Sequence, residues 1–297
     1  MSRAIVRAAP AKINLALEVL GRRADGFHDL VSIFATIDLA DRVRVAAARS
    51  LDVRIRPDVG APAGEDLATR AVQALAAAIG HPPFAHIRIR KRIPVAAGLG
   101  GGSSDAAAVL GALRRIWRVD IADLGADLAA DLGSIAASIG SDVPFFTAGT
   151  PFASVTGRGE SVRSLPAPPR ALWSVLVRVR ARLATPAVFA AVRREEWTDG
   201  AATAELAAAF ADGTIGPELL RRSVPNGLLA AAERVCPAIA DARAAAAAKG
   251  VALSLSGSGP TLFWIADGRA DALRCARTLR RAGLDAQALV LGVPVAL

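Results

Sequence analysis

The sequence of 297 residues contains no tyrosine, and aromatic residues make up only 4% of it. Because aromatic side chains are so scarce, the position of each phenylalanine is more informative than usual. The two cysteines, Cys236 and Cys275, do not have the CxxC spacing of zinc or redox motifs, and we expect reduced, packed thiols of an intracellular protein. His81 and His86 do not form a set of metal ligands.

The sequence also lacks a long hydrophobic run. No apolar stretch reaches about 18 residues, so we expect no membrane span and no membrane partner. The N-terminal run INLALEVL is short and contains Asn14 and Glu18, which does not fit a signal peptide. These features predict a cytoplasmic protein.

Lysine is almost absent, yet the net charge is +9 because arginine is abundant. A basic balance is compatible with nucleic-acid binding, with an anionic small substrate or with simple solubility. The arginines are scattered rather than clustered, which favours phosphorylated small molecules over nucleic acid as the main partner. The length, with 53% hydrophobic residues, suits two domains that share a cleft.

Hydrophobic periodicity predicts strands and helices in both halves of the chain. Strands are expected over 5–21, 31–48, 51–57, 84–95, 172–179 and 286–293, with hairpins over 151–165 and 251–266. Helices are expected over 66–80, 104–117, 123–140 with a break near Gly133, 186–249 in several segments, and 269–282, while 141–146 is predicted to be a turn. This mixture indicates an α+β fold. The proline-rich segment LPAPPR, residues 165–170, is the expected boundary between domains 1–165 and 166–297.

The segment PVAAGLGGGSSDAAAVL, residues 94–110, places glycines and two serines directly before a predicted helix. The first N–H groups of a helix are unpaired and partly positive, and glycines let an anion approach them closely. The segment therefore predicts a phosphate-binding loop, with Ser104 or Asp105 capping the helix. It lacks the lysine of a Walker loop and fits the dinucleotide-binding fingerprint poorly. A flexible turn before a capped helix is the alternative.

The same segment resembles the phosphate loop of the GHMP kinases, which bind ATP with a Gly/Ser-rich loop. Three further segments are similar to motifs of that family and follow in the expected order: PAKINLALEVLGRRADGFHDL (10–30), GSDVPFF (140–146) and SLSGSGPTLF (254–263). The resemblance covers essentially the full length. It implies an N-terminal ribosomal-protein-S5-like domain and a C-terminal ferredoxin-like domain, with ATP and substrate in the cleft between them.

The segment 10–30 is similar to one branch of the family, which acts in the non-mevalonate (MEP) pathway to isoprenoid precursors. For this branch, the resemblance implies that ATP phosphorylates the 2-hydroxyl of 4-diphosphocytidyl-2-C-methyl-D-erythritol, a cytidine diphosphate sugar alcohol. Two alternatives are another small-molecule GHMP kinase, of homoserine or mevalonate type, and a basic RNA-binding protein with an S5-like domain. We expect no nucleic-acid partner, and a monomer or a weak homodimer.

The resemblance assigns catalysis to Asp142 and Lys12. Asp142 would receive or direct the proton of the acceptor hydroxyl, although such a residue can also serve an Asx turn or a helix cap. Lys12 lies inside an apolar strand, where a lysine needs an anionic partner such as Asp142 or the transferred phosphate. Asn14 shares the face of Lys12 and is expected to contact the substrate or a phosphate.

The expected ATP-binding residues are Pro94, Gly98, Leu99, Gly100, Gly101, Gly102, Ser103 and Ser104. ATP would bring Mg²⁺, held mainly by phosphates and water, with Ser104 as one contact. No metal cage of protein side chains is visible in the sequence. Asp66 stands where the family often has asparagine, which leaves the contact with the nucleotide base open.

For the cytosine, the resemblance points to Phe27 and His28 on one side and Phe189 on the other. The family often has tyrosine in place of Phe27, so stacking is preserved and a hydroxyl contact is lost. Turn packing for Phe27 and core packing for Phe189 are the alternatives.

Three smaller residues complete the expected substrate site. Thr185 would contact the substrate, while Gly257 and Gly259 would shape the cleft near the phosphates by letting two backbones approach closely. A plain hairpin turn is the alternative for the glycines.

Overall fold

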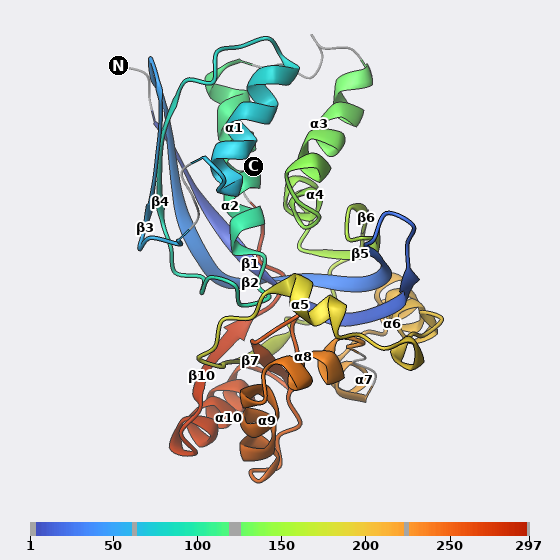
Figure 1. The fold of residues 1–297 in the computed structure, drawn as a ribbon. Coiled ribbons are helices and arrows are strands. Elements are labelled where there is room, and N and C mark those ends of the chain that lie inside the picture. Colours follow the sequence, from blue (N-terminus) through green and yellow to red (C-terminus); the bar gives the residue numbers. More distant parts are fainter. Residues whose placement is uncertain (1–3, 61–63, 119–125, 223–225, 296–297) are drawn as a thin grey trace.

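The computed structural model describes residues 4–60, 64–118, 126–222 and 226–295. Each half of the chain forms its own sheet with helices packed against it (Figure 1). The six strands of the first sheet lie between residues 5 and 164, and the four strands of the second lie between residues 173 and 290. The predicted α+β organisation is therefore confirmed.

The first sheet is organised around the long strand β2 (His28–Ala47). The similarly long β1 (Ile5–Arg22) pairs antiparallel with it along almost its whole length, and the predicted turn at Gly26 joins the two. Three register shifts interrupt this pairing, one of them between Asn14 and Ala16. Such bulges turn side chains locally, here in the segment that carries Lys12 and Asn14.

The remaining strands of this sheet pair with β2 at two separate places. β4 (Ala85–Arg90) pairs with residues 42–47 and β5 (Phe152–Gly157) with residues 30–35. β3 (Leu51–Arg56) runs parallel to β4, and β6 (Ser161–Ser164) runs antiparallel to β5. The part of β2 between these pairings is therefore available to the chain that leaves β4 toward the glycine-rich loop.

Helices α1 (Leu67–Ala78), α2 (Gly101–Ile116), α3 (Ala126–Ile139) and α4 (Val143–Thr147) gather on one side of this sheet (Figure 1). Their apolar faces and the sheet enclose one core, which includes Val43, Ile87, Val109, Leu113 and Phe145. Burial of such side chains is the main driving force that holds α2, and with it the glycine-rich loop, in place.

Three local predictions in this half were wrong. α2 begins at Gly101 after a left-handed Gly100, and no side chain caps it, so neither Ser104 nor Asp105 has the predicted capping role. The turn is made by glycine backbone, which periodicity of apolar residues does not detect. α3 continues through Gly133 without a break, although residues 123–125 of the prediction lie outside the described residues. Part of the predicted turn 141–146 forms the short helix α4, and Asp142 precedes it without capping it.

The second sheet contains four antiparallel strands in the order β10-β7-β9-β8. The strands are β7 (Trp173–Arg178), β8 (Ser254–Leu255), β9 (Leu262–Ala266) and β10 (Asp285–Val290). The helices are α5 (Thr185–Ala190), α6 (Ala201–Ala211), α7 (Pro217–Arg222), α8 (Leu229–Val235), α9 (Ala238–Ala247) and α10 (Arg269–Arg281), with a 3₁₀ turn at Arg194–Glu196. These positions agree with the predicted strands, hairpin and helical segments of this half.

A shared apolar core joins the two halves. It contains Ile13 and Phe152 from the first sheet, Phe263 and Leu289 from the second, and Phe210 from α6. An isolated β-bridge between residues 37 and 291 adds a backbone link. The proposed boundary near residues 165–170 falls in the segment between β6 and β7; the division into domains at that point stays a prediction.

Two predictions from composition concern the cysteines and the membrane. Cys236 and Cys275 are both free thiols, as expected, and burial raises the pKa of Cys275 to about 11. Within the described ranges, no helix is both long and apolar enough to cross a membrane.

A backbone crossing at Gly98 forms a second junction between the halves. Gly98 has a φ of +73°, and a Cβ atom placed on it would clash with the main-chain oxygen of Ser256. The Ser256 hydroxyl donates a hydrogen bond to the Gly98 carbonyl at 3.1 Å. Only glycine satisfies both the left-handed conformation and this close approach.

Gly98→Ala is expected to destabilise the fold by at least about 2 kcal/mol, because the new methyl group adds a backbone clash to the cost of the left-handed conformation. The matched control is Gly80→Ala, where φ is +63° and nothing lies within 4 Å of the new Cβ atom. Urea unfolding of the three proteins measures the difference. Equal losses of unfolding free energy in both variants would contradict the close approach of Gly98 to the Ser256 main chain.

A buried ion triad holds the chain that leads into the glycine-rich loop. The Lys91 ammonium lies 2.5 Å from Asp41 Oδ2 and 2.6 Å from Asp105 Oδ2, and all three side chains are almost fully buried. Asp41 Oδ1 also accepts hydrogen bonds from the backbone N–H groups of Arg92 and Ile93. The triad thus ties β2, the end of β4 and the first turns of α2 to one point.

The triad contains two carboxyl groups and only one ammonium group. The unbalanced negative charge affects the pKa values of its members. Burial, with a further contribution from the negative charge of Asp41, raises the pKa of Asp105 to about 7, although Lys91 acts in the opposite direction. Burial disfavours the charge of Lys91, but the two carboxylates outweigh it and raise the Lys91 pKa. One of the two carboxyl groups therefore holds a proton more tightly in the folded protein than in the unfolded chain.

Asp105→Asn is expected to gain stability relative to the wild type as pH rises from about 4 to about 7, because asparagine does not lose a proton in this window. The difference in free energy of unfolding should grow by more than about 1 kcal/mol, measured by urea unfolding at several pH values. Asp52→Asn is the control, since a hydrogen bond from Arg88 lowers the pKa of Asp52 and no change is expected above pH 4. Parallel pH curves for Asp105→Asn and wild type would contradict the raised pKa.

Candidate active site

A cavity of 1380 Å³ is lined by residues from both halves of the chain. Most of the residues predicted from the sequence line it: Lys12, Asn14, Phe27, His28, Pro94, Gly98, Leu99, Gly100, Gly101, Gly102, Ser103, Asp142, Thr185, Phe189 and Gly257. Ser104 and Gly259 are not among its lining residues. The fold therefore brings together segments that are far apart in the sequence.

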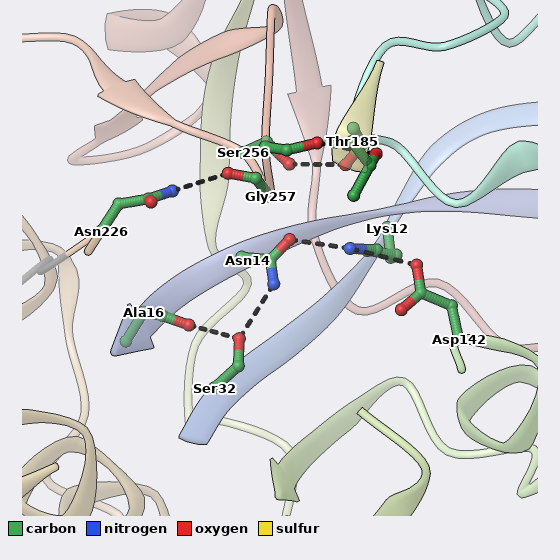
Figure 2. A network of polar contacts seen from close by, with 11 residues as sticks. Lys12, Asn14, Ala16, Ser32, Asp142, Thr185, Asn226, Ser256 and Gly257 are labelled. Carbon is green, nitrogen blue, oxygen red and sulfur yellow. Dashed lines mark hydrogen bonds and ion pairs between the residues drawn. The ribbon is translucent and has the colours of Figure 1, made fainter. Parts of the chain in front are cut away.

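The Lys12 side chain lies at the centre of this arrangement (Figure 2). Its ammonium donates a hydrogen bond to Asn14 Oδ1 at 2.8 Å and lies 3.4 Å from Asp142 Oδ2. It also lies 4.2 Å from the centroid of the Phe34 ring. Lys12 is 4% exposed, whereas the Asp142 side chain is 28% exposed. The lysine is thus fixed inside the protein, and the carboxylate faces the cavity.

A short relay of hydrogen bonds fixes the orientation of Asn14. Its amide nitrogen donates to Ser32 Oγ at 2.9 Å, and the Ser32 hydroxyl in turn donates to the Ala16 carbonyl at 2.5 Å (Figure 2). Because the Ser32 hydroxyl has given its proton to Ala16, it can only accept from Asn14. The amide oxygen of Asn14 must therefore point toward Lys12. This relay starts at the main-chain carbonyl of Ala16, beside the bulge in β1, and so the backbone of β1 positions the Lys12 ammonium through Ser32 and Asn14.

The glycine-rich loop packs directly against Lys12. The backbone N–H of Lys12 donates to the Leu99 carbonyl at 2.9 Å, and a Cβ atom on Gly100 would lie 3.1 Å from Lys12 Cγ. The loop then enters α2, whose unpaired N–H groups lie beside the cavity. Ser104 is buried and its hydroxyl has no hydrogen-bond partner among the described residues. The loop thus presents backbone donors and the Ser103 side chain to the cavity.

The SGSGP turn, residues 256–260, covers the loop from the other half of the chain. Ser256 holds Gly98 through a hydrogen bond, and the hydroxyls of Thr185 and Ser258 lie 2.9 Å apart. A Cβ atom on Gly257 would lie 3.3 Å from Asn14 Oδ1. The turn therefore lies close to the loop, with Gly257 beside the cavity.

Gly259, also predicted to shape the cleft, lies deeper in the second half. A Cβ atom placed on it would meet Leu255 and Ile239. Its backbone also lies close to Gly98, so Gly259 contacts the glycine-rich loop without lining the cavity.

An aromatic group lies at another part of the cavity. The rings of His28 and Phe189 are stacked, with centroids 5.2 Å apart, and Phe27 is 50% exposed. Burial, assisted by the charge of Arg22, lowers the pKa of His28, so its imidazole is neutral at physiological pH. The guanidinium of Arg158 lies 5.2 Å from the centre of the Phe27 ring. This group offers flat surfaces and a neutral imidazole to an aromatic ligand.

Asp66, whose role the sequence left open, is engaged by its own helix. Its carboxylate accepts hydrogen bonds from the Thr69 N–H at 2.9 Å and from the Thr69 hydroxyl at 2.6 Å. Asp66 is therefore the N-cap of α1, although it also lines the cavity.

Three contributors to this site were missed from the sequence. Asn226 donates from its amide to the Leu255 and Gly257 carbonyls and so fixes the SGSGP turn; the Asn-Gly pair at 226–227 was a turn signal. The Lys91 triad supports the loop, and the rarity of lysine was a signal for it. Arg158, between two glycines at a hairpin tip, was also overlooked.

Comparisons with known proteins agree with this site. The family model described as GHMP kinases N terminal domain matches residues 66–150, and the one described as GHMP kinases C terminal matches residues 206–285. A 4-diphosphocytidyl-2-C-methyl-D-erythritol kinase of Kineococcus radiotolerans is 40% identical over 283 residues, which cover 91% of this chain and 84% of the relative. A protein of the same name from Thermus thermophilus is 37% identical over 278 residues, 93% of each chain.

Solved structures give the same result. A crystal structure of 4-(cytidine 5'-diphospho)-2C-methyl-D-erythritol kinase has a TM-score of 0.77 and 36% identity, covering 97% of this chain and 100% of that chain. A homoserine kinase of Cytophaga hutchinsonii, with a TM-score of 0.70 and 20% identity over 99% of this chain and 96% of that chain, shares the fold. The predicted GHMP kinase fold and the prediction of an ATP-dependent small-molecule kinase are confirmed. The chain belongs to the GHMP kinases and, among them, to the 4-diphosphocytidyl-2-C-methyl-D-erythritol kinase family.

Proposed function

We propose that this protein transfers the γ-phosphoryl group of ATP to the 2-hydroxyl of 4-diphosphocytidyl-2-C-methyl-D-erythritol, within the MEP pathway to isoprenoid precursors. The observation that carries the proposal is the Lys12–Asp142 pair, 3.4 Å apart, in a cavity that also contains the glycine-rich loop and an aromatic group. The loop suits a triphosphate, the pair suits an alcohol acceptor, and Phe27, His28 and Phe189 suit a cytosine.

In the proposed reaction, the oxygen of the acceptor hydroxyl forms a bond to the γ-phosphorus as the bond to the β,γ-bridging oxygen breaks. Asp142 orients the hydroxyl and accepts its proton, and ADP leaves. The Lys12 ammonium donates to Asn14 and pairs with Asp142. In the proposed reaction it would also donate to the transferred phosphate. The charge of Lys12 offsets negative charge that spreads over the phosphoryl oxygens in the transition state.

We also propose that the glycine-rich loop binds the ATP phosphates through backbone N–H groups, from Gly98 to the start of α2. The described part of the chain contains no group of three His, Cys, Asp or Glu side chains that fits a metal ion. We propose that Mg²⁺ would arrive with ATP, held mainly by phosphate oxygens and water, and would neutralise phosphate charge. The net charge of +9 favours such anionic ligands. We further propose that the protein is a monomer or a weak homodimer and that it has no nucleic-acid partner.

The purified protein is expected to form ADP from ATP in the presence of 4-diphosphocytidyl-2-C-methyl-D-erythritol, but not with homoserine or mevalonate. A coupled assay measures ADP, and mass spectrometry shows whether the product is heavier by one phosphate. Omission of the cytidine monophosphate moiety, as in 2-C-methyl-D-erythritol 4-phosphate, should abolish turnover at the same concentration. Comparable turnover of homoserine or mevalonate would overturn the proposed substrate.

Asp142→Asn is expected to lower kcat by about a thousandfold, because the amide cannot accept the hydroxyl proton. The affinity for ATP should stay within a few-fold of wild type, since the loop is intact. The exposed Asp241→Asn serves as a control for loss of a carboxylate elsewhere. A kcat within a few-fold of wild type would show that Asp142 is not the base.

A further inference from the structure

Arg158 is a cation of the cavity that the proposed reaction does not yet use. It lies at the tip of the hairpin between β5 and β6 and lines the cavity. Its guanidinium is 5.2 Å from the centre of the Phe27 ring, so it covers one face of that ring. A guanidinium placed over an aromatic face is held by the ring and still presents its N–H groups at the edges.

The hairpin tip holds Arg158 in a defined position. The Glu160 carboxylate accepts a hydrogen bond from the Arg158 backbone N–H at 2.7 Å, and Arg158 Nη2 donates to the Ala137 carbonyl at 3.3 Å. The ion pair between the Arg158 and Glu160 side chains is loose, at 3.9 Å. Glu160 thus shapes the turn and leaves much of the guanidinium charge available.

Other carboxylates near the aromatic group are also engaged elsewhere. Asp25, which lines the same part of the cavity, lies 3.0 Å from Arg23 Nε and accepts a hydrogen bond from the Phe27 N–H. No tight ion pair to Arg158 occurs among the described residues. An anionic ligand can therefore approach this guanidinium without displacing a strong partner.

Arg158 also lies between the two ends of the substrate site. On one side is Phe27. On the other, a methyl group placed on the neighbouring Gly159 would lie 3.8 Å from Asp142 Oδ1 and 3.4 Å from Ser141 Cβ. A ligand whose base stacks at Phe27 and whose hydroxyl reaches Asp142 would therefore pass the hairpin tip that carries Arg158.

We propose that Arg158 binds the diphosphate that links the cytidine and the sugar alcohol, and so determines specificity for a nucleoside diphosphate ester. The inference rests on the proposed function, because it uses the positions of the base and the hydroxyl. The chemistry fits, since a guanidinium donates two parallel hydrogen bonds to phosphate oxygens.

Binding of cytidine, CMP and CDP, with the ATP site filled by a non-hydrolysable ATP analogue, tests this contact. In the wild type, affinity should rise from cytidine to CDP. In Arg158→Met, the ratio of the cytidine and CDP dissociation constants should fall by about tenfold, while Arg158→Lys keeps part of the ratio. The control is Arg163→Met, an exposed arginine of the same hairpin that does not line the cavity.

Steady-state kinetics give a second readout. Arg158→Met should raise the KM for the cytidine diphosphate substrate by about tenfold, with kcat and the KM for ATP within about twofold of wild type. An unchanged ratio of cytidine to CDP binding would overturn the inference, as would an equal loss in Arg163→Met. Equal losses of affinity for cytidine and CDP would also overturn it, because they would show that Arg158 only positions the Phe27 ring. If the wild type does not turn over the substrate, the proposed function is wrong. The ratio of the cytidine and CDP dissociation constants would still show whether Arg158 binds the diphosphate.

Discussion

The site depends on one buried charge, the ammonium of Lys12. A lysine that is 4% exposed is unfavourable unless polar groups surround it, and here the Asn14 oxygen, the Asp142 carboxylate and the Phe34 ring do so. Asn14 is in turn held by Ser32, so the acceptor side of its amide cannot rotate away from the lysine. Among these groups, the carboxylate reaches well into the cavity. Burial of the cation therefore also determines where the acid side chain points.

The glycine-rich loop needs support because glycines give it little stiffness of their own. Three contacts supply that support from different directions. The Lys91 triad fixes the entry to the loop, the Lys12 N–H holds the Leu99 carbonyl, and Ser256 holds Gly98 from the second half of the chain. Since the same loop residues touch Lys12, any shift of the loop would also move the cation. In the proposed reaction, main-chain contacts would thus link phosphate binding by the loop to the position of Lys12.

The sequence predicted most of the fold, and most of the site residues that it predicted line the cavity, for identifiable reasons. Alternation along β1 and the helical stripe of α2 are strong periodic signals, and the position of Lys12 in an apolar strand already required an acidic partner. The start of α2 was misplaced because Gly100 makes the turn with its backbone. Asn226 and Arg158 were missed because their contacts join elements that only the tertiary fold brings together. The pairing of Lys91 with two carboxylates likewise depends on the gap between two pairings along β2.

The separation of the aromatic group from the reactive pair has a consequence for selectivity. A small alcohol such as homoserine could reach Asp142, but it would leave Phe27, His28 and Phe189 without a ligand. Binding energy gained at the base, remote from the reacting atoms, is what places the hydroxyl of the larger substrate at the carboxylate. In the proposed reaction, the exposed Phe27 ring and His28 would therefore contribute to catalysis through substrate binding. In this proposal, the length of the ligand would connect base recognition at one end of the cavity with phosphoryl transfer at the other.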